Sequence, residues 1–187
     1  MQEKIFHHTY DNGLTLVAQP MPWLESAAFS IAVPAGFRYD PADKLGLANL
    51  VCEMVQRGSG NLNSRDWVEA LDMLGVDYNS SVSLYNMNFG GAMQAAQLND
   101  ALSIYADVIR RPALLESQLE DARMVCFQEV AALEDDLSQR AILRLRQNYY
   151  GQIDGRYSEG DMESVAKLSM EDVQSHFQQF FRPNGMV

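Results

Sequence analysis

Residues 46–59, GLANLVCEMVQRGS, form the stretch that decides the fold. Five of its apolar residues recur at helical spacing and so share one face of a helix predicted from Leu45 to Arg57: Leu47, Leu50, Val51, Met54 and Val55. The turn residues Asp40-Pro41-Ala42-Asp43 come before this helix, and Gly58 supplies a stop signal after it. A helix with such an apolar face has to pack against other elements of the chain.

The segment before this helix is predicted to be antiparallel sheet. Two extended stretches, Lys4 to Tyr10 and Leu14 to Gln19, flank Asp11-Asn12-Gly13, where Asn and Gly tolerate the positive φ of a tight turn. A third apolar run extends from Ala27 to Val33. Strands that follow one another without an intervening helix pair antiparallel.

The segment after this helix contains two more strands and several helices. Strands are predicted from Val76 to Ser83 and from Tyr85 to Met93. Helices are predicted at residues 67–74, 99–109, 116–134, 137–150, 162–167 and 170–180. The pattern is α+β without βαβ alternation: one antiparallel sheet of about four strands, covered on one face by helices, in a single domain over residues 1–187.

Composition and charge narrow the class of protein. At 187 residues and 47% hydrophobic content, the chain can bury the core of one compact domain. Its net charge of −11, dispersed over helical stretches, argues against nucleic acid as a partner. No apolar run approaches the ~20 residues that span a bilayer, and residues 1–6 are too short and polar for a signal peptide. We therefore predict a cytoplasmic protein without membrane contact. Cys52 and Cys126 lie on apolar helical stretches, which predicts buried free thiols.

The opening stretch resembles the zinc helix of the pitrilysin/insulinase metallopeptidases, an inverzincin family that includes processing-peptidase-like proteins. There the motif H-x-x-E-H stands within G-L-A-H-x-x-E-H-M-x-x-x-G-[ST], and the flanks align here without a gap. Four further segments are similar in order and spacing to N-G-L-x-V-V, V-x-x-G-x-R, G-x-x-x-N-A-x-T and Y-x-P-x-N-M: residues 12–17, 33–38, 74–81 and 181–187. The resemblance runs from end to end and implies the first domain of the family, one half of a clamshell.

This resemblance implies where the zinc chemistry of the family belongs. The family uses two imidazoles one helical turn apart, a glutamate base beside them, and a distant glutamate as third ligand. The aligned positions hold Asn49, Cys52, Glu53 and Glu129, so only the distant glutamate is retained. An amide is a poor zinc ligand, and a thiol with an ordinary pKa near about 8.5 is a poor base for activating water. Although the family implies zinc, we expect no catalytic residue, no metal ligand and no cofactor in this chain.

Three arrangements are open for the two carboxylates at these positions. If the zinc helix packs on the helix at 116–134 as the family fold implies, Glu53 and Glu129 face each other with both thiols nearby. The carboxylates could share a proton, take up a hard divalent cation, or be neutralised by Arg57, one turn beyond Glu53. We favour Arg57. None of the three histidines is expected to act as a metal ligand.

A second feature of the family is a sheet edge that binds an extended peptide as an added strand. Asn79, Ser80 and Ser81 stand at that position, where small polar side chains allow a peptide backbone to approach. The alternative is an ordinary exposed edge strand whose polar residues discourage aggregation. An acidic surface around such an edge favours basic peptides.

Together these features predict a non-catalytic zinc-peptidase-like domain or subunit that binds or encloses peptide with an active partner. One alternative is part of a zinc metalloendopeptidase whose metal ligands come from another domain or chain, and another is a purely structural domain. The chain ends at Met186-Val187, where the fifth strand of the family domain begins. We therefore expect a truncated sheet that a homodimer or a partner subunit completes.

Overall fold

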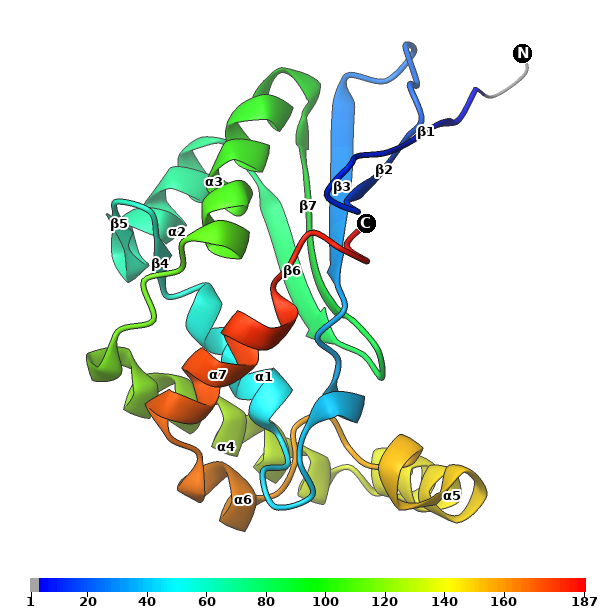
Figure 1. Cartoon of the computed structure of the whole chain (residues 1–187), viewed down its shortest axis with the longest axis vertical. Helices are drawn as coiled ribbons and strands as arrows, with labels where there is room; N and C mark the ends of the chain where they lie inside the picture. Colours follow the sequence, from blue (N-terminus) through cyan, green and yellow to red (C-terminus); the bar gives the residue numbers. More distant parts are fainter. Residues whose placement is uncertain (1–3) are drawn as a thin grey trace.

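The computed structural model describes residues 4–187, and it confirms the predicted antiparallel α+β architecture (Figure 1). The main sheet has the strand order β3-β7-β6, built from β3 (Ser26–Val33), β7 (Met87–Gln94) and β6 (Asp77–Val82). The register places Phe89 of β7 between Ile31 of β3 and Ser80 of β6. Within residues 4–187, β6 pairs with β7 alone, so β6 is an edge strand.

The remaining strands form two hairpins outside the main sheet. β1 (Phe6–Thr9) pairs with β2 (Thr15–Ala18), and β4 (Gly58–Ser59) pairs with β5 (Leu62–Asn63). The link between β2 and β3 contains Pro20 and Pro22, which lack the amide hydrogen that a sheet ladder needs. The first two predicted strands pair with each other and not with β3, and residues 186–187 lie between them and the main sheet, because Thr15 of β2 donates to the Met186 oxygen at 2.9 Å.

Seven α-helices occupy the intervals that the sequence predicts, with ends that differ by a few residues: α1 (Leu47–Val55), α2 (Ser64–Met73), α3 (Leu98–Arg110), α4 (Leu119–Asp135), α5 (Leu137–Asp154), α6 (Met162–Lys167) and α7 (Met170–Phe180). α5 extends beyond its predicted end because the chain leaves helical geometry at Gly151, at φ 81° and ψ −173°, and then resumes it. Of the helices in the described part of the chain, none combines the length and apolarity needed to cross a bilayer.

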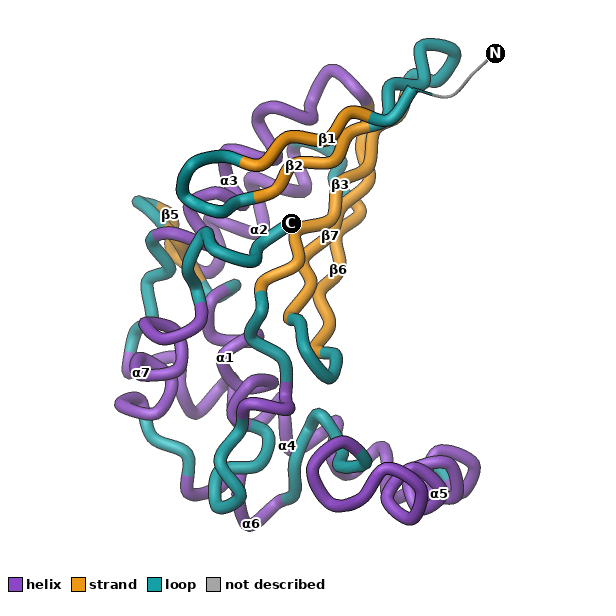
Figure 2. Tube along the Cα trace, turned by 45° about the vertical axis from the view of Figure 1, so that its right-hand side comes forward, coloured by secondary structure: helices purple, strands orange, loops and turns teal. Residues whose placement is uncertain are grey.

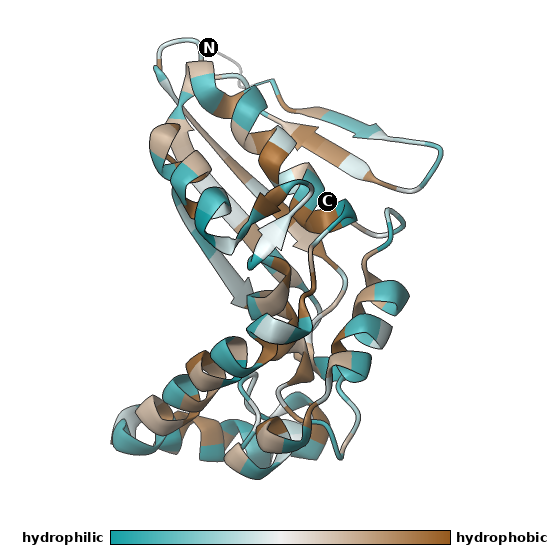
Figure 3. Cartoon of the chain, turned by 90° about the vertical axis from the view of Figure 1, so that its left-hand side faces the viewer, coloured by the Kyte–Doolittle hydropathy of each residue, from teal (hydrophilic) through white to brown (hydrophobic). Residues whose placement is uncertain are grey.

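The hydrophobic core lies between the main sheet and the helices, where the hydrophobic segments gather in Figure 3. α1 packs against α7, α4 and β6, and its residues Leu50 and Val51 are fully buried. Trp67 of α2, Tyr105 of α3 and Phe89 of β7 are the largest fully buried side chains. The helix predicted to decide the fold therefore lies at the centre of the packing.

The end of the described chain returns to the sheet (Figure 2). Val187 exchanges two backbone hydrogen bonds with Ala32 of β3, at 2.7 and 3.1 Å. The last residue thus lies along the side of β3 that faces away from β7. Whether a fifth strand is truncated here stays a prediction, and residues 1–3, part of the segment considered as a signal peptide, lie outside the described residues.

Candidate functional site on helix α1

The start of α1 is fixed by a glycine and a buried carboxylate. Gly46 adopts a left-handed φ of 85°, and a Cβ atom there would lie 2.5 Å from the carbonyl oxygen of Glu159. The Asp40 carboxylate accepts hydrogen bonds from the backbone N–H groups of Gly46 (3.2 Å) and Ala48 (3.0 Å). Burial raises the pKa of Asp40 to about 7. Asp40 therefore satisfies helix N–H groups that no earlier turn could satisfy.

Asn49 and Glu129 meet across the contact between α1 and α4. The side-chain Nδ2 of Asn49 donates to Oε2 of Glu129 at 2.6 Å, and it lies 3.7 Å from Sγ of Cys126. The two helices thus come together as the resemblance implied, although 80 residues separate the hydrogen-bonded pair. The carboxylate retained from the family pattern is engaged by the amide that replaces an imidazole.

Glu53 lies on the same half-buried face of α1, one turn beyond Asn49. Its Oε2 atom is 3.7 Å from Nη2 of Arg57, and both side chains are largely buried. Burial raises the pKa of Glu53, the charge of Glu129 raises it further, and Arg57 opposes both effects. Of the three arrangements open from the sequence, neutralisation by Arg57 is the one for which the structure provides the partner.

The two thiols lie inside this contact. Cys52 and Cys126 are both free and buried, which confirms that prediction. Burial raises the pKa of each thiol to about 12, so both are protonated near neutral pH. A protonated, buried thiol at position 52 does not take a proton from water.

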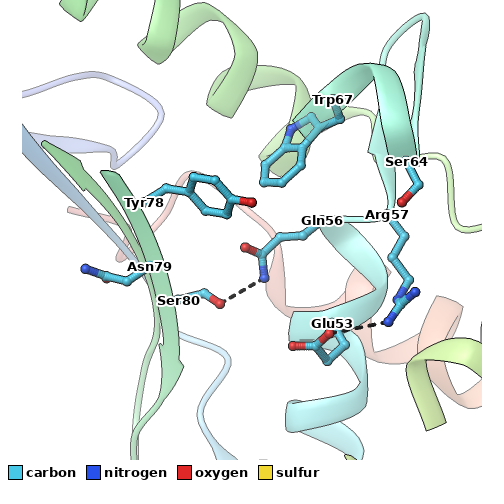
Figure 4. Close-up of a pocket in the computed structure, with 8 residues that line it drawn as sticks. All are labelled: Glu53, Gln56, Arg57, Ser64, Trp67, Tyr78, Asn79 and Ser80. Atoms are coloured by element: carbon cyan, nitrogen blue, oxygen red, sulfur yellow. Dashed lines mark hydrogen bonds and ion pairs between the residues drawn. The ribbon is translucent and has the colours of Figure 1, made fainter. Parts of the chain in front are cut away.

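A cavity of about 370 Å³ opens between Glu53 and the edge strand β6 (Figure 4). Ser80 of β6 points toward it and accepts a hydrogen bond from Nε2 of Gln56 at 2.9 Å, whereas Asn79 points away in Figure 4. Asn79 is exposed but still borders the cavity, whereas the exposed Ser81 does not, so two of the three predicted edge residues join the site. The cavity is lined by residues of α1, α2 and β6: Glu53, Gln56, Arg57, Ser64, Trp67, Tyr78, Asn79 and Ser80.

Sequence reasoning missed four residues of this cavity: Gln56, Ser64, Trp67 and Tyr78. Gln56 bridges α1 and β6, because its amide donates to both the Cys52 backbone oxygen (2.8 Å) and Ser80. Trp67 and Tyr78 meet edge to face, with ring centroids 5.4 Å apart. The position of Gln56 three residues after Glu53, on the same helical face, was the available signal. No local signal linked Trp67 to Tyr78, which belong to different elements.

The sequence profile of the insulinase family, peptidase family M16, matches residues 17–154. The match covers well over half of the chain, and this protein therefore belongs to the insulinase family of peptidases. The predicted resemblance is confirmed at the level of the family.

One relative and two solved structures show what the chain is similar to. An uncharacterized zinc protease of Rickettsia bellii is 25% identical over 136 residues, which cover 73% of this chain and 33% of the relative. The first half of the periplasmic protease PqqL from Escherichia coli has a TM-score of 0.89 at 20% identity, covering 98% of this chain and 41% of that one. A peptidase M16 inactive domain from Pseudomonas fluorescens has a TM-score of 0.82 at 16% identity, covering 93% and 43%.

These comparisons also show how much of each relative's length the chain spans. It spans between 33 and 45% of the length of the first relatives that it matches. The solved neighbour from Escherichia coli is one half of a larger peptidase, and this chain shares the fold of that half. A second half that pairs with this chain is consistent with the chain having the fold of one half of a peptidase.

The expectation that no cofactor is involved needs correction. Relatives of this chain are named zinc proteases, so membership of the family implies zinc. The residues at the aligned positions nevertheless do not fit the zinc site of the family, because Asn49 presents an N–H group to Glu129 and Cys52 is a protonated buried thiol. Within residues 4–187, no cluster of three His, Cys, Asp or Glu side chains is arranged around a common point.

Proposed function

We propose that this chain is a non-catalytic, peptide-binding half of an insulinase-family peptidase and works with a partner half that carries the intact motif. The observation that supports this proposal is the hydrogen bond from Asn49 to Glu129, which engages the Glu129 carboxylate in a contact between α1 and α4 of the same chain. Cys52, at the position of the general base, is buried and protonated. The likeness to a fold described as an inactive domain supports the same function.

Peptide binding is proposed at the edge of β6 and the adjoining cavity. The backbone of β6 faces no other strand of residues 4–187 on its outer side, so an extended peptide can pair with it. A side chain of that peptide reaches the cavity between Glu53 and the rings of Trp67 and Tyr78. The Glu53 carboxylate and the net charge of −11 favour a basic peptide.

A fluorescent, unfolded basic peptide tests this function. We expect saturable binding to the purified chain without cleavage, and about tenfold weaker binding by Glu53→Gln, because the charge nearest the cavity is lost. Glu69→Gln is the matched control, since it removes an exposed carboxylate from α2 outside the cavity. Absence of binding would favour a purely structural domain.

The alternative is that the chain is part of a zinc metalloendopeptidase, and it predicts that cleavage is absent from the assay above and appears once a second domain or chain is added. This alternative draws on two observations: relatives are named zinc proteases, and they are at least twice as long as this chain. In that case the metal ligands come from another domain or chain, and cleavage requires that second component. The isolated chain should then bind the peptide without cleaving it. Cleavage should appear only after the second component is added, which separates peptide binding from catalysis.

A further inference from the structure

Arg57 is held less firmly than its neighbour in the wall of the cavity. Its Nη2 atom lies 3.7 Å from Oε2 of Glu53, whereas charged N–H···O hydrogen bonds measure about 2.7 to 2.9 Å. Its Nε–H group is buried and has no hydrogen-bond partner within residues 4–187. Gln56, by contrast, donates to Ser80 at 2.9 Å and to the Cys52 backbone oxygen at 2.8 Å. Gln56 is therefore a fixed part of the wall, and Arg57 is not.

Helical spacing does not explain the long contact between Glu53 and Arg57. Asp107 and Arg111 of the α3 region stand in the same order, four residues apart, and their side chains are 2.7 Å apart. The Glu53–Arg57 pair is also the less exposed of the two, at 26% and 18% against 32% and 64%. Low exposure strengthens the attraction between opposite charges. The spacing thus allows a short contact, and its absence leaves the Glu53 carboxylate open to another donor.

The cavity gives such a donor access to Glu53. Glu53 and Arg57 lie along one side of the cavity, and Tyr78 and Ser80 of β6 lie along the other (Figure 4). A basic side chain of a peptide paired with β6 enters between these two sides. Two cations that approach one carboxylate repel each other. The side chain of the peptide and Arg57 therefore compete for the same partner.

We propose that Arg57 is an internal competitor of the peptide: it occupies the Glu53 carboxylate in the free chain, and a basic side chain of the bound peptide displaces it. This inference rests on the proposed binding of peptide at β6 and the cavity. It makes Arg57 a residue that determines specificity. A cation gains only the difference between its own contact with Glu53 and that of Arg57, whereas a neutral side chain does not compete at all. Arg57 therefore limits the affinity for basic peptides and leaves neutral ones unaffected.

Fluorescence anisotropy with two unfolded peptides tests this competition. The first peptide carries lysines as its only cationic side chains, and the second is the same peptide with the lysines acetylated, which removes their charges. We expect Arg57→Gln to bind the lysine peptide about tenfold more tightly than the parent chain, because Glu53 has lost its internal partner. The acetylated peptide should not distinguish the two chains.

Further variants separate competition for Glu53 from the effect of net charge. Arg111→Gln is the matched control, since it removes the same charge from an exposed pair of the same spacing outside the cavity. Arg57→Lys keeps the competing charge and should return the affinity toward that of the parent chain. In the Glu53→Gln background, Arg57→Gln should change the affinity by less than about twofold, because the contested carboxylate is gone. Arg57→Met, which retains the apolar stem without the charge, repeats the test, and circular dichroism checks that each variant is folded.

Failure of this inference differs from failure of the proposed function. If the parent chain binds the lysine peptide and Arg57→Gln binds it equally or more weakly, Arg57 does not compete, while peptide binding stands. Tighter binding by Arg111→Gln, or a gain that persists in the Glu53→Gln background, also overturns the competition. If neither the parent chain nor Arg57→Gln binds either peptide, the proposed function fails and this inference fails with it.

Discussion

α1 and α5 place their apolar residues in opposite environments. Seven of the nine residues of α1 are buried in the core, whereas none of the 18 residues of α5 is buried. α1 is stabilised by packing against α4, α7 and β6, and α5 by contacts at its two ends. The comparison indicates that α1 stabilises the fold through its packing, whereas α5 contributes no buried residue to the core.

Thiol chemistry should separate the two helices most strongly. In the folded chain, Cys52 and Cys126 should react with a disulfide reagent at pH 8 about 10³-fold more slowly than a cysteine introduced by Leu145→Cys. Their pKa of about 12 leaves little thiolate, and burial blocks the reagent. Absorbance of the released thiolate gives the rates. In denaturant all three thiols should react alike. Equal rates in the folded chain would show that the thiols of α1 and α4 are as accessible and as reactive as a thiol on α5.

Truncation of one leucine in each helix compares their contributions to stability. Leu50→Ala should lower the free energy of unfolding by about 2 to 5 kcal/mol, because Leu50 is fully buried in α1. Leu145→Ala on α5 should change it by less than about 0.5 kcal/mol, because Leu145 is exposed. Urea denaturation followed by circular dichroism measures both. A large effect of Leu145→Ala would mean that α5 belongs to the core.

Restoring the family motif tests whether the geometry of the site is kept. The triple variant Asn49→His, Cys52→Glu, Glu53→His places two imidazoles beside Glu129, and its affinity for zinc should exceed that of the parent chain by about 100-fold or more. Competition with a chromophoric chelator measures the affinity. Adding Glu129→Ala to the triple variant should remove most of this gain.

The matched control for this variant uses α5. Ile142→His with Arg146→His also sets two imidazoles one turn apart, but α5 offers them no residue equivalent to Glu129. Its affinity for zinc should remain well below that of the triple variant. Equal affinities would show that α4 adds nothing to the restored site.

The smallest effect expected is a change in how stability depends on pH. The folded pKa of Asp40 is raised from 3.8 to about 7, so its contribution is present at low pH and is lost as pH rises through 7. The folded pKa of His176 is lowered by burial from 6.5 to about 4, so its contribution is lost as pH falls from 6.5 to 4. Between pH 4 and 6.5, Asp40 lowers the free energy of unfolding as pH rises and His176 raises it, so the two effects oppose each other.

Asp40→Asn should remove the opposing slope of Asp40 and expose that of His176, while the raised pKa values of Glu53 and Glu159 act alike in the variant and the parent chain. Stability of the variant should rise with pH between 4.5 and 6.5 by about 1 kcal/mol per pH unit, whereas the parent chain changes little over that range. Urea denaturation at a series of pH values provides the measurement. A flat profile in Asp40→Asn would show that His176 does not titrate below its ordinary range. The variant tests the anchor of α1 directly, since the corresponding start of α5 is capped by the exposed turn at Asp136.

Local patterns predicted the elements well and their assembly less well. The predicted strand from Val76 to Ser83 is observed as Asp77–Val82, because alternating side chains and flanking turns specify a strand locally. The strands and the turn of the β1–β2 hairpin were predicted, but its separation from the main sheet was not. The choice between one sheet and two depends on contacts between distant strands. The cytoplasmic location stays a prediction.

The residues of the candidate site also fall into those predicted from local sequence and those found only from the packing. Asn49, Cys52, Glu53 and Glu129 could be placed by counting along a family pattern. The partner of Glu53 could be predicted as well, since Arg57 stands one turn beyond it, but the partner of Asn49 could not, because local spacing does not fix which group on α4 its amide meets. Gln56, Trp67 and Tyr78 entered the site only through the packing of α1 and α2 on the edge strand.

The sequence by itself determined the family, the antiparallel α+β class and the place of the helix that aligns with the zinc helix of the family. These properties depend on residues close together along the chain, where apolar spacing, turns and motif flanks act locally. The tertiary structure alone decided that Asn49 engages Glu129 across 80 residues and that no residue of α5 is buried. Burial and pairing depend on which surfaces meet, and apolar spacing along a helix does not show whether that helix packs in the core or remains exposed.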